Sequence, residues 1–293
     1  MNNEEKKKGQ KLQEDTAPAE IMTLKDIQDK EAAADQRRAD LQKEIEEIEQ
    51  QKNDYIREHE KMPNWEALKP LDENFKIRRE DYYGENGGII FPNPNAPTAV
   101  YEDLEFVEDI LKHNPEVLVI VDEAYIDFGG VSARTLIDQY DNLLVVQTFS
   151  KSRSMAGMRI GFALGNAELI KALNDFKYSF NSYTMNQAAL MLGAEAVKDR
   201  AYFEECVEKI KVTRAWTCEE LKKLGFEFNE PMANFVFVTH PKYAAKDIFM
   251  ALREQKIFVR YFSLPRIDNY LRITIGTDEE MRKLVGFLKD YVK

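Results

Sequence analysis

Five polar side chains follow three short apolar segments and combine groups that can do acid–base and covalent chemistry. In chain order they are Asn95, Asp122, Tyr125, Ser150 and Lys151. They supply an amide, a carboxylate, a phenol, a hydroxyl and a primary amine. Each group alone is common on protein surfaces, so their chemistry depends on a fold that brings them together.

An amine, a carboxylate and a phenol in this combination suit one cofactor, pyridoxal phosphate. The amine of Lys151 can form a Schiff base with the cofactor aldehyde. The carboxylate of Asp122 can keep the pyridine nitrogen protonated, which makes the ring an electron sink. Tyr125, or an amide, can donate a hydrogen bond to the ring oxygen. Ser150 and Arg159 can hold the phosphate, because a guanidinium is a two-pronged donor.

The segments that must position these groups read as strands at residues 89–91, 117–121 and 143–147. The second is wholly apolar, as expected of a strand that is covered on both faces. An amphipathic helical pattern at 101–113 separates the first two. Strands that alternate with helices predict an α/β sheet with mostly parallel strands, and ligands of such sheets bind beyond the carboxyl ends of the strands.

The rest of the chain carries further strands and helices. A strand is expected at 160–164, and helices are expected at 167–176, 184–197 and 201–224. Shorter elements follow, with strands at 226–228, 234–238, 257–259 and 271–275 and helices at 244–254 and 278–291. We therefore expect a partial large cofactor-binding domain over residues 70–200. A small α+β domain, with its connecting helix, should cover residues 201–293.

Residues 1–69 differ in composition from the rest of the chain. The first 60 residues hold 17 acidic and 11 basic side chains, and no glycine lies between Gly9 and Gly84. Apolar or aromatic residues recur at seven-residue spacing, at Ile27, Ala34, Leu41, Ile48 and Tyr55. The pattern predicts a charged tail and a long helix over about 24–60. That helix is either a weak coiled coil that recruits a partner or a second copy, or a solvated single helix.

Composition and charge exclude several classes of function. The 293 residues carry a net charge of −11 and a pI of about 5.0, whereas a dedicated nucleic-acid binder normally presents a basic face. No segment approaches the ~20 apolar residues of a membrane span. Cys206 and Cys218 make no disulfide framework, and the N-terminus shows no secretory signal, so a cytoplasmic protein is expected. His59, His113 and His240 are scattered and indicate no metal site.

Residues 70–293 resemble the histidinol-phosphate aminotransferase family of fold-type I, pyridoxal-phosphate enzymes. The matching segments are FPNPNAPT at 91–98, VDEAYIDF at 121–128, TFSKSRSMAGMRIGF at 148–162, IFVRYF at 257–262 and NYLRITIGT at 269–277. The lysine segment matches the class-II aminotransferase signature position after position. The resemblance implies transfer of an amino group between histidinol phosphate and 2-oxoglutarate or glutamate, as in histidine biosynthesis, by a homodimer.

The resemblance also implies roles for particular residues. Lys151 would bond covalently to the cofactor and later move a proton, while Asp122 would pair with the ring nitrogen and Tyr125 with the ring oxygen. Ser150 and Arg159 would bind the cofactor phosphate. In the substrate half of the site, Arg272 would clamp the α-carboxylate and Arg260 would face the phosphate end. Asn95 would be a further cofactor contact.

The sequence departs from the family pattern in three places. The family loop usually reads Asn-Pro-Thr-Gly, but Ala96 precedes Pro97 here and Asn95 stands one residue earlier. Ala99 replaces the family glycine, at a cost of about 1 kcal/mol if the backbone there has positive φ. Residues 1–69 stand where the family has a long segment with a phosphate-binding glycine turn and central strands. We therefore expect an N-terminally truncated domain joined to an unrelated helical segment, with apolar faces left exposed.

Three other functions remain open from the sequence. A phosphothreonine decarboxylase-type enzyme shares the fold and the motifs. A catalytically impaired remnant would keep the lysine but lose the positioning on which rates depend. An interaction protein would use the N-terminal helix to bind a partner and keep the aminotransferase part as a scaffold.

Overall fold

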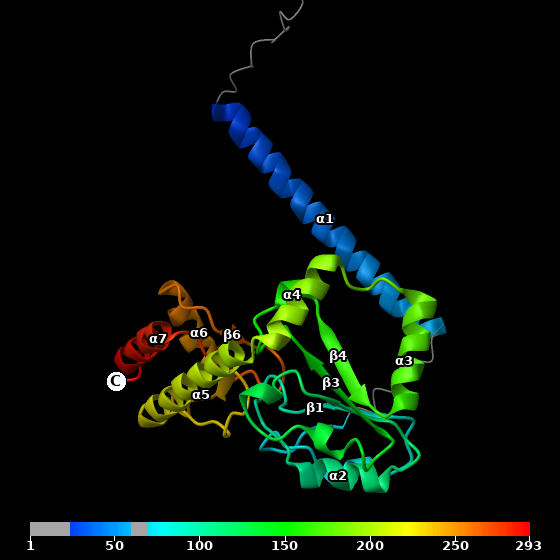
Figure 1. The fold of residues 1–293 in the computed structure, drawn as a ribbon. Helices are drawn as coiled ribbons and strands as arrows, with labels where there is room; N and C mark the ends of the chain where they lie inside the picture. The colour runs from blue at the N-terminus through cyan, green and yellow to red at the C-terminus, as the bar shows by residue number, and fades with distance from the viewer. Residues whose placement is uncertain (1–23, 60–68) are drawn as a thin grey trace, which may run out of the picture. The chain divides into compact units, whose positions relative to one another are not determined.

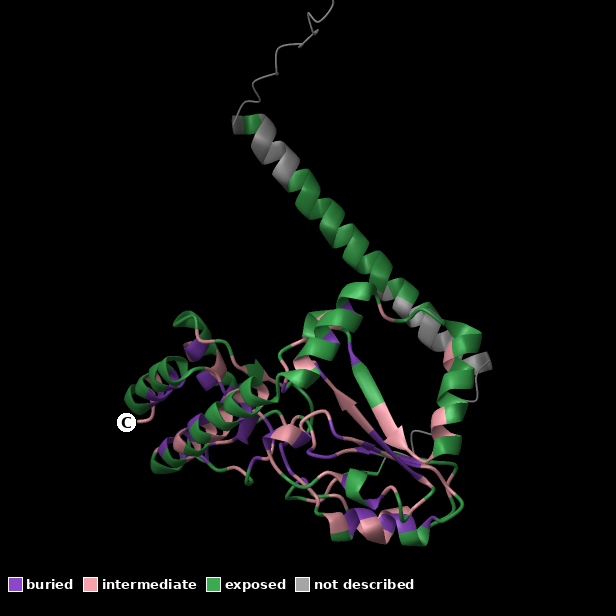
Figure 2. Cartoon of the chain, viewed as in Figure 1, coloured by how far each residue is buried: buried purple, intermediate pink, exposed green. Residues whose placement is uncertain are grey.

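The computed structural model describes residues 24–59 and 69–293, which fall in two units that divide between Lys69 and Pro70. In the first unit, helix α1 runs from Leu24 to His59 and confirms the helix expected over about 24–60. The side chains described along α1 are exposed, among them Leu41, Ile45 and Ile48 (Figure 2). The predicted tail lies outside the described residues, and the coiled coil stays a prediction.

The second unit contains a four-stranded sheet (Figure 1). Its strands are β1 (Ile89–Pro92), β2 (Val119–Asp122), β3 (Leu143–Thr148) and β4 (Gly161–Gly165). They lie side by side in chain order; the first three are parallel and β4 runs antiparallel to β3. The predicted α/β class with mostly parallel strands is therefore confirmed.

Helix α2 (Leu104–His113) covers one face of this sheet. Its apolar stripe is buried against alternate residues of the strands and comprises Phe106, Val107, Ile110 and Leu111. The helix begins later than the predicted residue 101, because the Asp103 carboxylate accepts a hydrogen bond from the Phe106 amide at 2.8 Å and acts as the N-cap. Packing of α2 on the sheet holds the strands in register, and it therefore also sets the positions of the residues that follow their carboxyl ends.

The opposite face of the sheet is covered unevenly. Ile90, Ile120 and Leu144 pair across β1, β2 and β3 and form one row on this face. Exposure falls along the row, from 68% at Ile90 to 5% at Leu144. Helix α3 (Ala167–Phe180) follows β4, and it has no buried residue, whereas helix α4 (Gln187–Lys198) buries Ala189 and Gly193. The apolar surface near β1 therefore stays open.

The C-terminal part is a smaller α+β layer. Its elements are α5 (Arg200–Lys223), β5 (Phe235–Val238), α6 (Ala245–Glu254), β6 (Arg260–Tyr261), β7 (Leu271–Thr274) and α7 (Asp278–Tyr291). The antiparallel sheet has the order β5-β7-β6, and α5, α6 and α7 pack on one face of it. Helix α7 starts with a capping box, in which the Glu280 carboxylate accepts a hydrogen bond from the Thr277 amide and the Thr277 hydroxyl accepts one from the Glu280 amide. The other face of this sheet carries Phe235 and Phe237, which are buried against Ala99 and Phe75, and it also carries Arg272.

Two predicted strands of this layer are wrong in position, and both errors have the same cause. The Phe226 amide donates to the carbonyl of Leu221 and completes the end of α5, so that residues 226–228 keep only one bridge, Glu227 to Thr239. The Ile257 amide likewise donates to Leu252 at the end of α6, which displaces the strand from 257–259 to β6. In both places a backbone N–H group that a strand would need for pairing instead donates a hydrogen bond to the last turn of the preceding helix.

Candidate active site

The carboxyl end of β2 places Asp122 between the ends of its two neighbouring strands. In the register of the sheet, Asp122 lies opposite Pro92 of β1 and Val146 of β3. Its side chain is half-buried, and one oxygen accepts a hydrogen bond from the Ala124 amide at 3.0 Å. The other oxygen makes no hydrogen bond with any described residue and is available to a ligand at the end of the strand.

The side chain of Glu123 points away from that of Asp122 and has a structural role. It is 2% exposed, and it accepts hydrogen bonds from the Ser132 hydroxyl at 2.5 Å, the Ala133 amide at 2.6 Å and the Gln147 side chain at 2.8 Å. Burial raises the pKa of this carboxyl, although the three donors oppose the shift. Glu123 therefore ties the loop after β2 to β3, and Asp122 alone serves the strand-end site.

Lys151 lies in the loop after β3 and approaches Tyr125. Its Nζ atom is 5.2 Å from the centre of the Tyr125 ring, and within residues 24–59 and 69–293 no carboxylate lies within 4.0 Å of it. The next residue, Ser152, is buried and donates a hydrogen bond to the Asp127 carboxylate. That bond joins the lysine loop to the segment after β2. The amine is thus held beside a phenol without being consumed in an ion pair.

Ser150 and Arg159 lie on opposite arms of the β3–β4 connection. Thr148 pairs with Gly161, and the Phe149 amide donates to the Ile160 carbonyl at 3.1 Å, so Ser150 and Arg159 occupy the next positions across the hairpin. Arg159 is exposed and has left-handed backbone dihedral angles, with φ +55°. One of its terminal nitrogens donates to the Ala156 carbonyl, which leaves its other N–H groups for an anion.

Asn95 shapes its own loop. Its side-chain oxygen accepts a hydrogen bond from the Thr98 hydroxyl at 2.8 Å, and its backbone carbonyl accepts one from the Ala99 amide at 2.9 Å. The side-chain NH₂ of Asn95 makes no hydrogen bond with a described residue, so it can still donate to a ligand. Ala99 has φ +62°, so the strain expected from replacing glycine there is present.

Arg272 and Arg260 lie on the face of the small sheet that also carries Phe235 and Phe237. Arg272 lies opposite Phe237 of β5 on one side and Arg260 of β6 on the other. Its guanidinium carbon is 5.1 Å from the centre of the Phe235 ring. Its Nε atom is buried and makes no hydrogen bond within the described parts of the chain. A buried cationic donor without a partner is costly, so this atom favours an anionic ligand.

Contacts connect the two halves of the site through an aromatic residue that the sequence pattern did not single out. The Phe235 ring meets the Tyr125 ring edge-on at 5.1 Å and also contacts Arg272. Phe235 and Ala99 belong to one buried cluster, which brings the Asn95 loop to the same place. Among the eight predicted site residues, the side chains of Lys151 and Tyr125 are in contact, and the remaining ones share strand ends or a sheet face.

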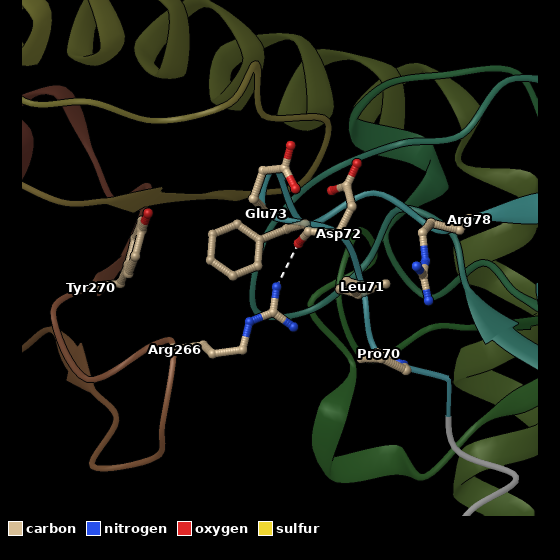
Figure 3. A pocket seen from close by; sticks show the side chains of 8 residues that line it. Pro70, Leu71, Asp72, Glu73, Arg78, Arg266 and Tyr270 are labelled. Carbon is tan, nitrogen blue, oxygen red and sulfur yellow. Dashed lines mark hydrogen bonds between the residues drawn. The ribbon is translucent and has the colours of Figure 1, made fainter.

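A pocket of about 500 Å³ lies beyond Phe237, at the edge of this region (Figure 3). It is lined by Pro70, Leu71, Asp72, Glu73, Phe75, Arg78, Arg266 and Tyr270. In the view of Figure 3, the Arg266 guanidinium donates to the Asp72 carbonyl, at 2.5 Å. Tyr270 stacks on Phe237 with the ring centres 4.6 Å apart and so separates the pocket from Arg272. None of the predicted site residues lines it.

Within the described parts of the chain, no helix is long and apolar enough to cross a membrane. The same residues contain no group of three or more His, Cys, Asp or Glu side chains arranged to hold a metal ion.

The chain is similar in sequence to known aminotransferases. The family model "Aminotransferase class I and II" matches residues 22–288, a range that starts two residues before α1 and includes the whole helix. A histidinol-phosphate aminotransferase of Clostridium botulinum strain Langeland is 51% identical over 225 residues, which are 77% of this chain and 64% of that protein. The chain thus spans somewhat less than two thirds of the length of this relative.

Two solved structures support the fold. The histidinol-phosphate aminotransferase of Clostridium acetobutylicum superposes with a TM-score of 0.69 at 29% identity, covering 76% of this chain and 70% of that one. A decarboxylase from Sulfurospirillum multivorans superposes with a TM-score of 0.66 at 26% identity, covering 77% and 69%. The strand-end lysine, the sheet order and the family match agree with one another: the chain belongs to the class I and II aminotransferases and has their fold-type I architecture.

Proposed function

We propose that this chain is a pyridoxal-phosphate-dependent aminotransferase that moves an amino group between histidinol phosphate and 2-oxoglutarate or glutamate. One observation carries the proposal. The amine of Lys151 lies against the Tyr125 ring, free of any ion pair with a described residue, at the strand ends where Asp122 also stands. Family membership and the printed name of the Clostridium botulinum relative support the reaction and the substrate.

The residues present fit pyridoxal phosphate in their donor set. Lys151 offers a free amine, Asp122 an uncommitted carboxylate oxygen, and Tyr125 a hydroxyl without a hydrogen bond to any described residue. Ser150 and Arg159 offer a hydroxyl and a guanidinium on adjacent positions of one hairpin. When bound, the cofactor supplies an aldehyde that bonds to amines and a protonated ring that withdraws electrons.

The residues around the proposed cofactor site would have separate roles in binding the cofactor and in moving a proton. Asp122 would keep the ring nitrogen protonated through its negative charge, and Tyr125 would donate a hydrogen bond to the ring oxygen. Ser150 and Arg159 would bind the phosphate and fix the orientation of the ring. The Nζ atom of Lys151, once released from the cofactor, would take a proton from the amine-bearing carbon of the substrate as a general base.

The two arginines of the small sheet would bind the substrate. Arg272 presents a planar fork that fits a carboxylate, and its buried Nε atom is ready to donate. Arg260 lies opposite Arg272 on the same face, close enough to share an anion or to meet a phosphate. A pair of guanidiniums suits two substrates that each carry at least one strong anion, as histidinol phosphate and glutamate do.

Cofactor binding is the first test. Purified protein is titrated with pyridoxal phosphate, the visible absorbance band is recorded, and borohydride reduction with peptide mass mapping locates the adduct. We expect an adduct on Lys151, no band in Lys151→Ala, and a normal band in Lys171→Ala, whose lysine is exposed and paired with Asp175. Adducts spread over surface lysines, or no band, would reject the proposal.

Substrate identity is the second test. Histidinol phosphate and glutamate should each change the absorbance of the bound cofactor. When histidinol phosphate and 2-oxoglutarate are supplied together, the ketone product and glutamate should be formed without release of carbon dioxide. The decarboxylase among the structural neighbours favours one alternative, phosphothreonine decarboxylase-type chemistry. Carbon dioxide released from phosphothreonine, together with no response to histidinol phosphate, would select it.

The remaining assignments extend this proposal. The net charge of −11 supports a protein that does not bind nucleic acid, and the two free cysteines, Cys206 and Cys218, support a cytoplasmic location. A homodimer is the proposed assembly, with residues 70–200 as the cofactor-binding domain and 201–293 as the small domain. Sedimentation of the full chain with and without residues 1–69 tests the assembly and the role of α1.

A further inference from the structure

Phe235 occupies the junction between the strand-end residues and the small sheet. Its side chain is 2% exposed. The ring meets the Tyr125 ring edge-on at 5.1 Å, with the planes 87° apart, and lies 5.1 Å from the guanidinium carbon of Arg272. Lys151 Nζ is 5.2 Å from the other partner, the Tyr125 ring. An unbroken series of contacts therefore leads from the amine to the guanidinium.

The backbone around Phe235 is held from both domains. The Met232 amide donates to the Ala99 carbonyl at 2.9 Å, which joins the strand start to the loop after β1. Arg214 of α5 donates to the Ala233 carbonyl at 2.5 Å. Because these bonds lie two and three residues before Phe235, the ring has little freedom to move relative to Tyr125.

Arg272 depends on this ring. Arg272 lies two residues from Thr274, which pairs with Phe235 in the β5–β7 register, and long or aromatic side chains can bridge this diagonal distance. Burial deprives its Nε atom of water, and the described residues offer it no hydrogen-bond acceptor. The electron-rich face of Phe235 attracts the cation and holds it in place while its N–H donors stay available.

We propose that Phe235 is a positioning residue that sets the distance between the Arg272 guanidinium and the Lys151–Tyr125 pair. It thereby sets the spacing between the anion and the amino group that a substrate must match. This inference rests on the proposed roles of Arg272 and Lys151. Phe235 itself touches no reacting atom; it acts by keeping Arg272 where a substrate anion must bind.

Four variants separate this role from general packing. Phe235→Leu and Phe235→Met both remove the ring, and the second keeps the proposal testable if the first fails to fold. Phe235→Tyr keeps the ring. Phe226→Leu is the control, because Phe226 is 4% exposed in the core of the same small domain and makes its ring contact with His240. Thermal melting of each variant checks the fold.

Two measurements report on Arg272. The first is the rate at which phenylglyoxal labels Arg272 in cofactor-free protein, followed by peptide mass mapping. The second is the separation of KM for glutamate from kcat, together with the affinity for pyridoxal phosphate. In Phe235→Leu we expect labelling of Arg272 and KM each to rise about tenfold, with kcat changed less than about threefold, because a cation–π contact and its positioning are lost. Phe235→Tyr should stay within about twofold of the wild type.

Other results would overturn the proposal. Unchanged labelling and unchanged KM in the ringless variants would show that Arg272 holds its place alone. A fall in kcat at constant KM, or equal effects in Phe226→Leu, would assign Phe235 to the lysine side or to general packing. If wild-type protein binds no cofactor, the proposed function fails, yet the labelling of Arg272 still decides whether Phe235 positions it.

Discussion

Arg260 and Arg272 lie directly opposite each other on the antiparallel strands β6 and β7, with their side chains on the same face of the sheet. Like charges in this arrangement repel and destabilise a sheet. Phe262 and Phe235 each contact one of the two guanidiniums, at 5.6 and 5.1 Å. Aromatic faces thus offset part of the repulsion, and the remaining positive potential favours an anion beside the two guanidiniums.

The two arginines should contribute unequally to substrate binding. Arg272 has a buried Nε atom, whereas Arg260 is exposed. Arg272→Lys keeps the charge but loses the fork, so we expect kcat/KM for glutamate to fall about 100-fold. Arg260→Lys should lower it less than about fivefold, because an exposed charge is screened by solvent. Steady-state kinetics of both variants test this order, and a larger loss in Arg260→Lys would contradict it.

The local sequence pattern was sufficient to predict the residues at the strand ends. It was insufficient to predict the contacts that link them to the small sheet. Asp122 and Lys151 could be predicted because each follows a short apolar run, and such runs end at one edge of a parallel sheet. Phe235 could not, because its contacts with Tyr125 and Arg272 join segments far apart in the chain. Within its own strand it reads only as one more apolar residue.

The boundaries of several elements were missed for reasons that are visible in the backbone. The strand expected at 257–259 failed because the Ile257 amide completes the end of α6. The start of α2 carried a usable signal, since Asp103 precedes the apolar stripe and caps the helix. In α1, the absence of glycine and the seven-residue spacing were enough to predict a helix, because no tertiary contact was needed to define it.

Replacing Glu123 should destabilise the large domain. Glu123→Ala removes the acceptor of three donors, the Ser132 hydroxyl, the buried Ala133 amide and the Gln147 side chain. We expect a loss of about 2–4 kcal/mol in the free energy of unfolding, measured by urea denaturation. Glu123→Gln keeps one carbonyl oxygen and should lose less. Equal stabilities of wild type and Glu123→Ala would show that water replaces the carboxylate.

The pH dependence of the difference in stability between wild type and Glu123→Gln gives a separate prediction. Burial raises the pKa of Glu123 in the folded protein above that in the unfolded chain. The favourable contribution of the protonated acid is therefore fully present below the unfolded value and is lost as pH rises through the folded value. Glu123→Gln cannot ionise, so wild type should lose stability relative to it as pH rises from about 4 upward. A constant difference would contradict the raised pKa.

The contribution of Glu220 to stability should depend on pH in the opposite direction, because its pKa is lowered in the folded protein. Glu220 of α5 pairs with Lys223 of the same helix and with Lys289 of α7, each at 2.7 Å, and these two hydrogen bonds lower its pKa to about 2. Its contribution to stability is present above its unfolded pKa and is lost as pH falls through the folded value. Glu220→Gln should melt below wild type at pH 7, and the two melting temperatures should converge toward pH 2. Glu208→Gln, at an exposed position of α5 without a salt bridge to a described residue, is the control.

Two glycines should respond to alanine with opposite signs. Gly130 has φ +89°, and an added Cβ would lie 2.5 Å from the Tyr101 ring, whose hydroxyl is fixed by hydrogen bonds to Val131. Gly130→Ala should therefore cost about 2 kcal/mol or more, since strain and overlap add. Gly286 lies inside α7 with no atom within 4 Å of an added Cβ, so Gly286→Ala should gain about 0.5–1 kcal/mol. Urea denaturation of both variants tests the signs; stabilisation by Gly130→Ala would mean that the loop after β2 can move away from Tyr101.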